Sequence, residues 1–195
     1  MSLKINAIYN NIKYLCHLKT KKNKFSIKRI DDKLIRGRAT SNLRILYNLK
    51  KNGITQIIDL RNPSTELSEY VPQGIERIFC HLLNINYCNF KYSHKLEKMP
   101  EITFFEKIND KILNNNGKTL IHCRHGKRRT GVCVAIYEKY HTNKNKDDIL
   151  NELYNTGFRE LQDKSNKISK GVYSRLTKIY NDFIENFYPN EARIK

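Results

Sequence analysis

The sequence predicts an α/β protein in which a central, mostly parallel sheet is flanked by helices on both faces. Short apolar runs rich in β-branched residues alternate along the chain with segments whose apolar residues recur at helical spacing. A chain of 195 residues, 39% of them hydrophobic, is also long enough to bury the core of one such domain. Strands that alternate with helices favour parallel pairing, because each helix carries the chain back to the edge where the next strand starts.

The first expected element is an amphipathic helix over residues 4–17. Its apolar residues recur at helical spacing and are Ile5, Ile8, Tyr9, Ile12, Leu15 and Cys16. A basic linker follows, with Lys19, Lys21, Lys22 and Lys24. Such a helix either caps the fold or lies on an anionic membrane surface, and the sequence leaves both interpretations open.

Turn residues and apolar spacing predict the remaining elements. In the first half we expect strands at Phe25–Arg29, Lys33–Arg36, Ile54–Leu60 and Glu76–Leu83, a helix capped by Thr40 or Ser41 that ends at Asn52-Gly53, a short helical piece ending near Tyr70, and an irregular loop over 84–99. In the second half we expect a helix from Pro100 to about 113, a strand at Thr119–His122, a helix at Thr130–His141, and helices near 146–155 and 167–187.

Composition limits where the protein acts and what it attracts. No stretch approaches the roughly 18 apolar residues of a membrane span, the first 16 residues do not resemble a signal peptide, and the five cysteines form no CxxC pair. We therefore expect a cytoplasmic protein without a disulfide framework. The net charge of +18 is concentrated at the two ends of the chain and favours polyanionic partners, although a composition generally rich in Lys and Asn explains it equally well.

The most informative segment runs from Leu120 to Gly131. An apolar strand ends at Cys123, and a helix begins about six residues later, so the backbone between them must curl at a helix N-terminus. Converging N–H groups at the positive end of a helix form an anion site of about phosphate size. Gly126 lies in the middle of this loop, where a side chain would crowd a bound anion or the backbone would need a positive φ.

The same segment supplies a nucleophile. Surrounded by amides, a helix dipole and cationic side chains, the Cys123 thiol should have a lowered pKa and be a thiolate at neutral pH. Arg129 can hold two phosphoryl oxygens with its planar guanidinium, and the Thr130 hydroxyl can stabilise the sulfur as it leaves. His122 is expected to orient the loop through hydrogen bonds. The candidate phosphate-binding residues are Arg124, His125, Gly126, Lys127, Arg128 and Arg129.

The pattern His-Cys-x-x-Gly-x-x-Arg-Thr-Gly, from His122 to Gly131, resembles the signature of the cysteine-dependent protein tyrosine and dual-specificity phosphatase superfamily. The resemblance covers roughly residues 25–187. It implies an α/β fold, a phosphocysteine intermediate, and no metal or other cofactor. It also implies a division into an N-terminal helix and linker over 1–24, a phosphatase domain over 25–187 and a tail over 188–195.

The basic residues of the loop resemble two branches of that superfamily. Arg124 and Lys127 resemble tensin-type phosphoinositide phosphatases, whereas His125, Lys127 and Arg128 resemble small atypical dual-specificity enzymes that act on inositol pyrophosphates. Both branches prefer crowded anions. The alternative is that these side chains point into solvent and only raise the local potential.

One feature of the superfamily is missing. Its members usually carry an aspartate general acid about thirty residues before the cysteine, but this chain has no aspartate between Asp59 and Asp110. His94 and Glu97 are candidate substitutes, and Asn86 lies near the expected position although an amide cannot supply a proton. The remaining alternative is that no side chain protonates the leaving oxygen. Asp59 and Asp110 are expected to be structural.

Other polar residues have two interpretations each. Arg36, Arg38 and Arg61 follow or end predicted strands, where they either widen the anion site or remain solvated surface charges. Cys80 and Cys88 are candidates to trap an oxidised Cys123 as a disulfide, and Cys133 is expected to lie in the core.

The leading functional hypothesis is a metal-independent phosphatase. Its substrate is a phosphorylated protein or a polyanionic small molecule such as a phosphoinositide or inositol polyphosphate. The alternatives are a phospho-binding pseudophosphatase that has lost its acid, and an RNA 5′-phosphatase, which the charge of +18 suits. RNA and an anionic membrane are candidate partners of the basic N-terminal segment.

Overall fold

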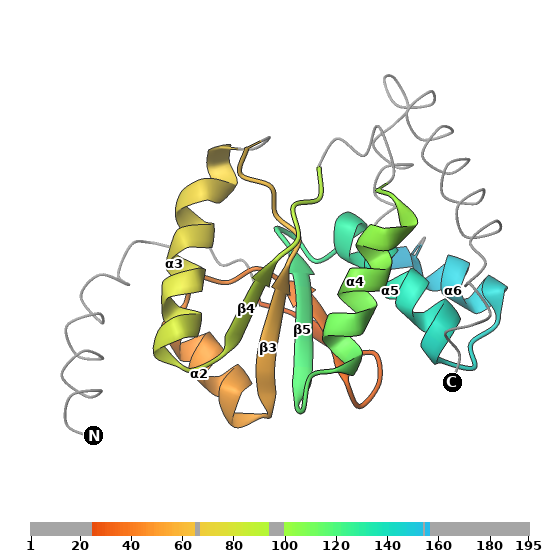
Figure 1. Cartoon of the computed structure of the whole chain (residues 1–195), viewed down its shortest axis with the longest axis horizontal. Coiled ribbons are helices and arrows are strands. Elements are labelled where there is room, and N and C mark those ends of the chain that lie inside the picture. Colours follow the sequence, from red (N-terminus) through yellow and green to blue (C-terminus); the bar gives the residue numbers. More distant parts are fainter. Residues whose placement is uncertain (1–24, 65–66, 94–99, 154, 157–195) are drawn as a thin grey trace.

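The computed structural model describes residues 25–64, 67–93, 100–153 and 155–156. Five strands form one sheet in the order β1-β2-β5-β3-β4 (Figure 1). They are β1 (Ile27–Arg29), β2 (Leu34–Arg38), β3 (Ile54–Asp59), β4 (Asn86–Asn89) and β5 (Lys118–Cys123). β1 pairs antiparallel with β2, and all other pairs are parallel, so the predicted mostly parallel sheet is confirmed.

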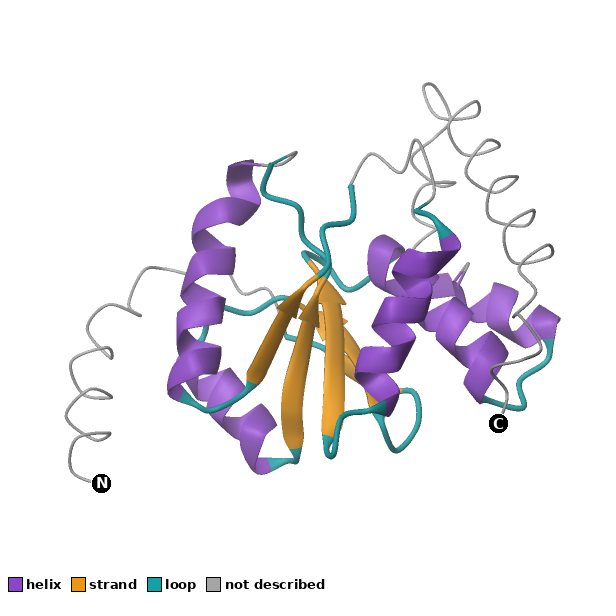
Figure 2. Cartoon of the chain, viewed as in Figure 1, coloured by secondary structure: helices purple, strands orange, loops and turns teal. Residues whose placement is uncertain are grey.

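Helices cover both faces of this sheet (Figure 2). The short 3₁₀ helix η1 (Leu67–Glu69) and the helices α2 (Leu43–Lys51) and α3 (Tyr70–Leu82) lie to one side, and α4 (Ile102–Leu113), α5 (Arg128–His141) and α6 (Lys146–Leu153) lie to the other. Each face has its own apolar core. Ile57 and Leu120 point toward α2 and α3, whereas Ile58 and Ile121 point toward α4 and α5, as the alternation of side chains along a strand requires.

The strand register brings three strand ends together. Arg38 of β2 pairs with Cys123 at the end of β5, and Asp59 at the end of β3 pairs with His122. Because these strands are parallel, the segments that follow them all leave from the same edge of the sheet. Open α/β sheets place their ligands at this edge, and the candidate loop lies there.

Most predicted elements are found, with small shifts at their ends. The helix cap is an exception, since Asn42 caps α2 in place of Thr40 or Ser41. Its Oδ1 accepts hydrogen bonds from the amides of Arg44 and Ile45 at 3.0 and 3.2 Å. The predicted helix end at Asn52-Gly53 is correct, and Gly53 adopts a φ of +87°.

Two predicted elements between β3 and α4 are wrong. Glu76–Leu83 is not a strand but the second half of α3, and the predicted loop at 84–99 contains the strand β4. Pro72 lies in the first turn of α3, where the missing N–H does no harm. The predicted elements at 4–17 and 167–187, with the flanking linker and tail, lie outside the described residues. No helix in the described part of the chain is long and apolar enough to cross a membrane.

Candidate active site

The loop between β5 and α5 holds Cys123 at its base. The side chain is 4% exposed, and the loop Arg124–Lys127 joins it to the first turn of α5. Burial alone would raise the pKa of the Cys123 thiol. The positive charge of Arg129, the hydroxyl and amide of Thr130 and the amide of His125 outweigh burial and hold this pKa below its usual value. The loop therefore favours the thiolate, the form that attacks phosphorus.

Gly126 allows the loop to lie directly on β2. Its φ is +69°, and a Cβ at this position would lie 2.2 Å from the carbonyl oxygen of Gly37. The sequence offered two reasons for this glycine, a positive φ or the space for an anion. The structure supports the first and adds close packing on the neighbouring strand as a second.

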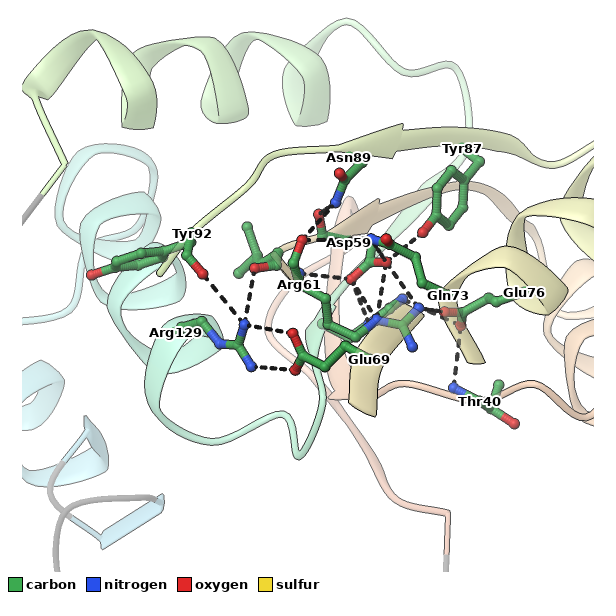
Figure 3. Close-up of polar contacts among 12 residues, drawn as sticks. Thr40, Asp59, Arg61, Glu69, Gln73, Glu76, Tyr87, Asn89, Tyr92 and Arg129 are labelled. Atoms are coloured by element: carbon green, nitrogen blue, oxygen red, sulfur yellow. Dashed lines mark hydrogen bonds and ion pairs between the residues drawn. The ribbon is translucent and has the colours of Figure 1, made fainter. Parts of the chain in front are cut away.

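The charge of Arg129 acts on the Cys123 sulfur. A carboxylate that the sequence did not reveal, Glu69, holds the Arg129 guanidinium (Figure 3). Its Nη2 donates to Glu69 Oε1 at 2.6 Å, and its Nη1 donates to Glu69 Oε2 at 3.2 Å. Nη1 also donates to the backbone carbonyls of Tyr92 and Leu60, at 3.3 and 3.4 Å. These four bonds fix the plane of the guanidinium, and three of them come from Nη1.

His122 belongs to a separate buried cluster on the other side of the strand end. Its Nε2 lies 3.3 Å from Glu76 Oε1 and its Nδ1 lies 3.7 Å from Asp59 Oδ1. Burial lowers the pKa of His122, but the charges of Glu76 and Asp59 outweigh burial and raise it. The ring is fully buried and faces these two carboxylates at the end of β5, immediately before Cys123. Its expected role in orienting the loop through hydrogen bonds stays a prediction.

Arg61 completes this cluster. Its guanidinium bonds Asp59 at 2.8–3.0 Å and also bonds Glu76. Tyr87 and Gln73 donate to the same Asp59 carboxylate. Burial raises the pKa of Asp59, whereas His122, Arg61 and Tyr87 lower it, with a net result of about 2. Asp59 is therefore structural, as predicted, and Asp110 lies exposed on α4.

The interpretation of Arg36 and Arg61 as solvated surface charges is wrong. Arg36 is 5% exposed and Arg61 is 2% exposed. Arg61 is neutralised by the two carboxylates below the loop, and Arg36 donates to backbone carbonyls of the loop itself. Arg38 is half-buried at the end of β2. Buried arginines need such partners. Those of Arg36 lie 90 and 91 residues away in the sequence, whereas Asp59 is only two residues from Arg61.

The remaining cations of the loop lie at its rim. Arg124, His125 and Arg128 are exposed, and Lys127 is half-buried. Arg124 donates to Ser68 Oγ of η1 at 2.9 Å, so η1 contacts the loop through Ser68 as well as through Glu69. No side chain caps the N-terminus of α5, and its first turn carries no acidic residue. No acidic residue of α5 itself therefore offsets the positive potential at this helix end.

The structure does not bring Asn86 to the site. Asn86 begins β4 and donates to Gln56 Oε1 at 3.1 Å, whereas Asn89, three residues further, pairs with Asp59 at the site edge. Three residues of strand separate them by about 10 Å. The other two candidate acids, His94 and Glu97, lie outside the described residues.

The other three cysteines in the described part of the chain, Cys80, Cys88 and Cys133, are poor nucleophiles. Cys133 lies in the core as expected, and burial raises its pKa well above the usual value. Burial raises the pKa of Cys80 to about 12, and it also raises that of Cys88. Cys80 packs with α2 and α3, in the core on the opposite face of the sheet from the core that contains Cys123. The role of Cys80 and Cys88 in trapping an oxidised Cys123 stays a prediction.

The cluster below the loop also has the spacing of metal ligands. One donor atom each from Asp59, Glu76 and His122 lies within 4.8 Å of the others. However, the Arg61 guanidinium already bonds both carboxylates. A divalent ion would have to displace this fixed cation, so the cluster suits a side-chain cation better than a metal. The expected independence from metal stays a prediction.

A strand, a phosphate-sized loop and a helix around a cysteine of lowered pKa define a phosphatase of the cysteine-dependent class. The chain belongs to the tyrosine phosphatase family, since the sequence profile of that family matches residues 11–189. No curated protein matches it by sequence. The match to the family profile confirms the resemblance that the loop sequence predicted.

Solved structures of phosphatases share the fold. The core catalytic domain of the PP-IP phosphatase SIW14 from Saccharomyces cerevisiae, in complex with citrate, has 20% identity and a TM-score of 0.57, covering 85% of this chain and 86% of that one. A cysteine-to-serine variant of Pseudomonas aeruginosa TpbA, bound to phosphotyrosine, has 14% identity and a TM-score of 0.56, covering 84% and 95%. Kinase-associated phosphatase has 16% identity and a TM-score of 0.59, covering 86% and 100%.

Proposed function

We propose that the protein hydrolyses phosphate esters or anhydrides through a phosphocysteine intermediate on Cys123. The observation that carries this proposal is the lowered pKa of a buried cysteine at the base of an anion-sized loop. A site that only binds phosphate has no need of a thiolate. This argues against the alternative of a pseudophosphatase.

The reaction has two steps. The Cys123 thiolate attacks phosphorus, a P–S bond forms, and the bond to the leaving oxygen breaks with its electron pair on that oxygen. A water molecule then attacks phosphorus, the P–S bond breaks with its pair on sulfur, and phosphate and a proton are released. Thr130, which contributes to the lowered pKa of Cys123, is expected to stabilise the thiolate as it leaves by donating its hydroxyl to the sulfur.

Arg129 and the loop amides bind the phosphoryl oxygens. Glu69 holds the Arg129 guanidinium in one plane, so its position is set before substrate arrives. Hydrogen bonds arranged in advance gain strength as charge moves onto the phosphoryl oxygens in the transition state. His122 contributes indirectly by anchoring β5.

The expected substrates carry several phosphates close together. The rim cations Arg124, Lys127 and Arg128, with His125 beside them, support this class, as does the shared fold with a PP-IP phosphatase. Phosphotyrosine proteins, and phosphoserine or phosphothreonine proteins in a dual-specificity enzyme, remain in the same class of reaction. The net charge of +18 keeps an RNA 5′-phosphatase as a second candidate. Five cysteines without a CxxC pair fit a reducing compartment such as the cytoplasm.

A substrate panel tests the proposal. Phosphotyrosine and phosphoserine peptides, phosphoinositides, inositol pyrophosphates and 5′-triphosphate RNA are compared with the parent and with Cys123→Ser. We expect the variant to lose turnover by more than about 1,000-fold and still bind inorganic phosphate, because a hydroxyl is a much poorer nucleophile. Turnover within about tenfold of the parent would exclude Cys123 as the nucleophile.

Leaving groups of graded pKa test the missing acid. If no side chain protonates the leaving oxygen, kcat/KM should favour aryl phosphates and phosphoanhydrides over phosphoserine, without a high-pH loss of rate. A flat dependence, with a high-pH loss that disappears in His94→Ala or Glu97→Gln, would show that one of these residues is the acid.

A further inference from the structure

Arg36 in β2 is a buried arginine whose partners belong to the phosphate loop. It pairs in the sheet with Ile121, two residues before Cys123. Its Nη2 donates to the carbonyl oxygen of Gly126 at 2.9 Å and to that of Lys127 at 3.2 Å. Arg36 is 5% exposed, and the first of the two loop carbonyls that it bonds lies 90 residues further along the chain. Its guanidinium is therefore a fixed support of the loop.

These two hydrogen bonds determine where the next amides point. All described peptide bonds are trans, and in a trans peptide the N–H lies opposite the carbonyl. Because Arg36 holds the carbonyls of Gly126 and Lys127, the N–H groups of Lys127 and Arg128 must point away from Arg36. They belong to the start of α5, where no side chain caps the helix. The Lys127 carbonyl also accepts from the Gly131 amide at 2.7 Å. Arg36 therefore orients the Lys127 amide through Gly126, and it orients the Arg128 amide together with the first turn of α5.

The loop is also pressed against β2 next to this arginine. Gly126 approaches the backbone of Gly37, the residue after Arg36, so closely that no Cβ would fit. The strand therefore supports the loop twice, by backbone packing at Gly37 and by hydrogen bonds from Arg36. Neither support depends on a bound ligand.

Glu152 of α6 lies on the far side of Arg36. Its Oε1 is 3.8 Å from Arg36 Nη1, and its carboxylate also pairs with Lys28 at 2.7 Å and with Lys144 at 3.0 Å. Burial raises the pKa of Glu152, but the two lysines outweigh it and lower the pKa. A charged Glu152 therefore faces Arg36 and ties the loop to α6.

We propose that Arg36 is a positioning residue that orients the Lys127 and Arg128 amides toward the phosphoryl group, and that Glu152 keeps Arg36 in place. The kinetic part of this proposal rests on the proposed function. Arg36 touches no substrate, since it acts from behind the loop through the carbonyls. Its loss should weaken phosphate binding and slow attack by Cys123 together, because misplacement of the loop affects both.

The test compares Arg36→Met, Arg36→Lys and Glu152→Gln with Arg77→Met, which removes an exposed arginine from α3 on the other face of the sheet. The measurements are kcat and KM for p-nitrophenyl phosphate, the Ki of inorganic phosphate, the pH dependence of Cys123 alkylation, and Tm. We expect kcat/KM of Arg36→Met to fall about 100-fold. Its phosphate Ki should rise about tenfold, and its alkylation should shift to higher pH.

Arg36→Lys separates geometry from charge. It keeps the positive charge, but its side chain is one atom shorter and cannot bond both carbonyls in the same way. We expect it to lose at least about tenfold in kcat/KM, and Glu152→Gln to change about threefold in the same direction. Arg77→Met should match the parent.

Two results would overturn the proposal. The first is that both Arg36 variants keep kcat/KM and the Ki of inorganic phosphate within about threefold of the parent. The other is a lower Tm with unchanged Ki and alkylation profile, which is the behaviour of a purely structural residue. If Arg36→Met does not fold, Arg36→Lys and Glu152→Gln decide by the same criteria. A parent without turnover would instead contradict the proposed function, while phosphate binding and alkylation would still test Arg36.

Discussion

Arg61 and Arg129 are both buried beside carboxylates near the end of β3, yet their surroundings differ (Figure 3). Arg61 bonds two carboxylates, those of Asp59 and Glu76. Arg129 bonds one carboxylate, Glu69, and completes its coordination with backbone carbonyls. The two sites therefore differ in how much fixed negative charge faces each guanidinium.

This difference separates a structural ion cluster from a working one. Two fixed carboxylates bond Arg61, so its positive charge is already compensated and no further anion is attracted. Arg129 faces one fixed carboxylate and the Cys123 sulfur, and it lowers the pKa of that sulfur. A buried cation with fewer fixed anions keeps its attraction for an incoming phosphoryl group.

The largest expected effects come from replacing each of these two arginines by lysine. Arg129→Lys should lower kcat/KM by about 100- to 1,000-fold, because a point charge cannot hold two oxygens in one plane. It should cost less unfolding free energy than Arg61→Lys, because Arg129 bonds one buried carboxylate and not two. Arg61→Lys should cost about 3 kcal/mol of unfolding free energy, since buried carboxylates lose a partner. Its kcat per folded molecule should stay within about tenfold of the parent. Kinetics and chemical denaturation of both variants check this contrast, and equal rate losses without destabilisation would refute it.

Glu69→Gln should have a smaller effect on the same arginine. The amide keeps the shape of the side chain but fixes the guanidinium less firmly, so kcat for p-nitrophenyl phosphate should fall about tenfold. The Ki of inorganic phosphate should not rise, because the site has lost a negative charge. Glu101→Gln, at the exposed start of α4, is the matched control. A raised phosphate Ki with unchanged kcat would mean that Glu69 serves binding and not orientation.

The fold was predictable where its signals are local, and it was mispredicted where they conflict. β3 and β5 are apolar runs bounded by turns, so their assignment needed nothing else. The second half of α3 contains a short apolar run, Ile78-Phe79-Cys80, and such a run imitates a strand although Ile78 is exposed and Phe79 is buried. β4 is a short edge strand with a polar sequence, Asn86–Asn89, that is held by pairing with β3 on one side. Tertiary contacts overrode propensity in both cases.

In the candidate site, too, the residues close together in sequence were predictable and the distant ones were not. Cys123, Arg129 and Thr130 lie within eight consecutive residues, so their spacing alone indicated the chemistry. Glu69 lies 60 residues from its partner Arg129, and Arg36 lies 90 residues from Gly126. An acidic residue after a turn, or an arginine within a strand, carries no signal in one sequence. These supports became visible once the parallel register brought the strand ends together.

Acid should weaken the Arg61 cluster through Asp59. The pKa of Asp59 falls from 3.8 to about 2 on folding, so its stabilisation is present above about pH 4 and is lost as the pH falls toward 2. The shift corresponds to about 2 kcal/mol. Urea denaturation between pH 5 and 2 should show this loss in the parent and a smaller one in Asp59→Asn. Tyr87→Phe, which removes one donor to Asp59, should lie between them, and identical pH slopes in all three would contradict the assignment.

The smallest effect should come from the rim, where charge is exposed and screened. Arg128 lies exposed at the start of α5, so Arg128→Gln should change kcat/KM for p-nitrophenyl phosphate by no more than about twofold. A substrate with several phosphates extends to the exposed Arg128 side chain. For this substrate we expect kcat/KM of Arg128→Gln to fall about fivefold at low salt. The loss should disappear near 1 M salt, where the Debye length is about 3 Å. Lys51→Gln, exposed at the far end of α2, is the control for net charge. Kinetics at several ionic strengths measure this, and equal losses for both substrates at all salt concentrations would place Arg128 in the phosphate cradle itself.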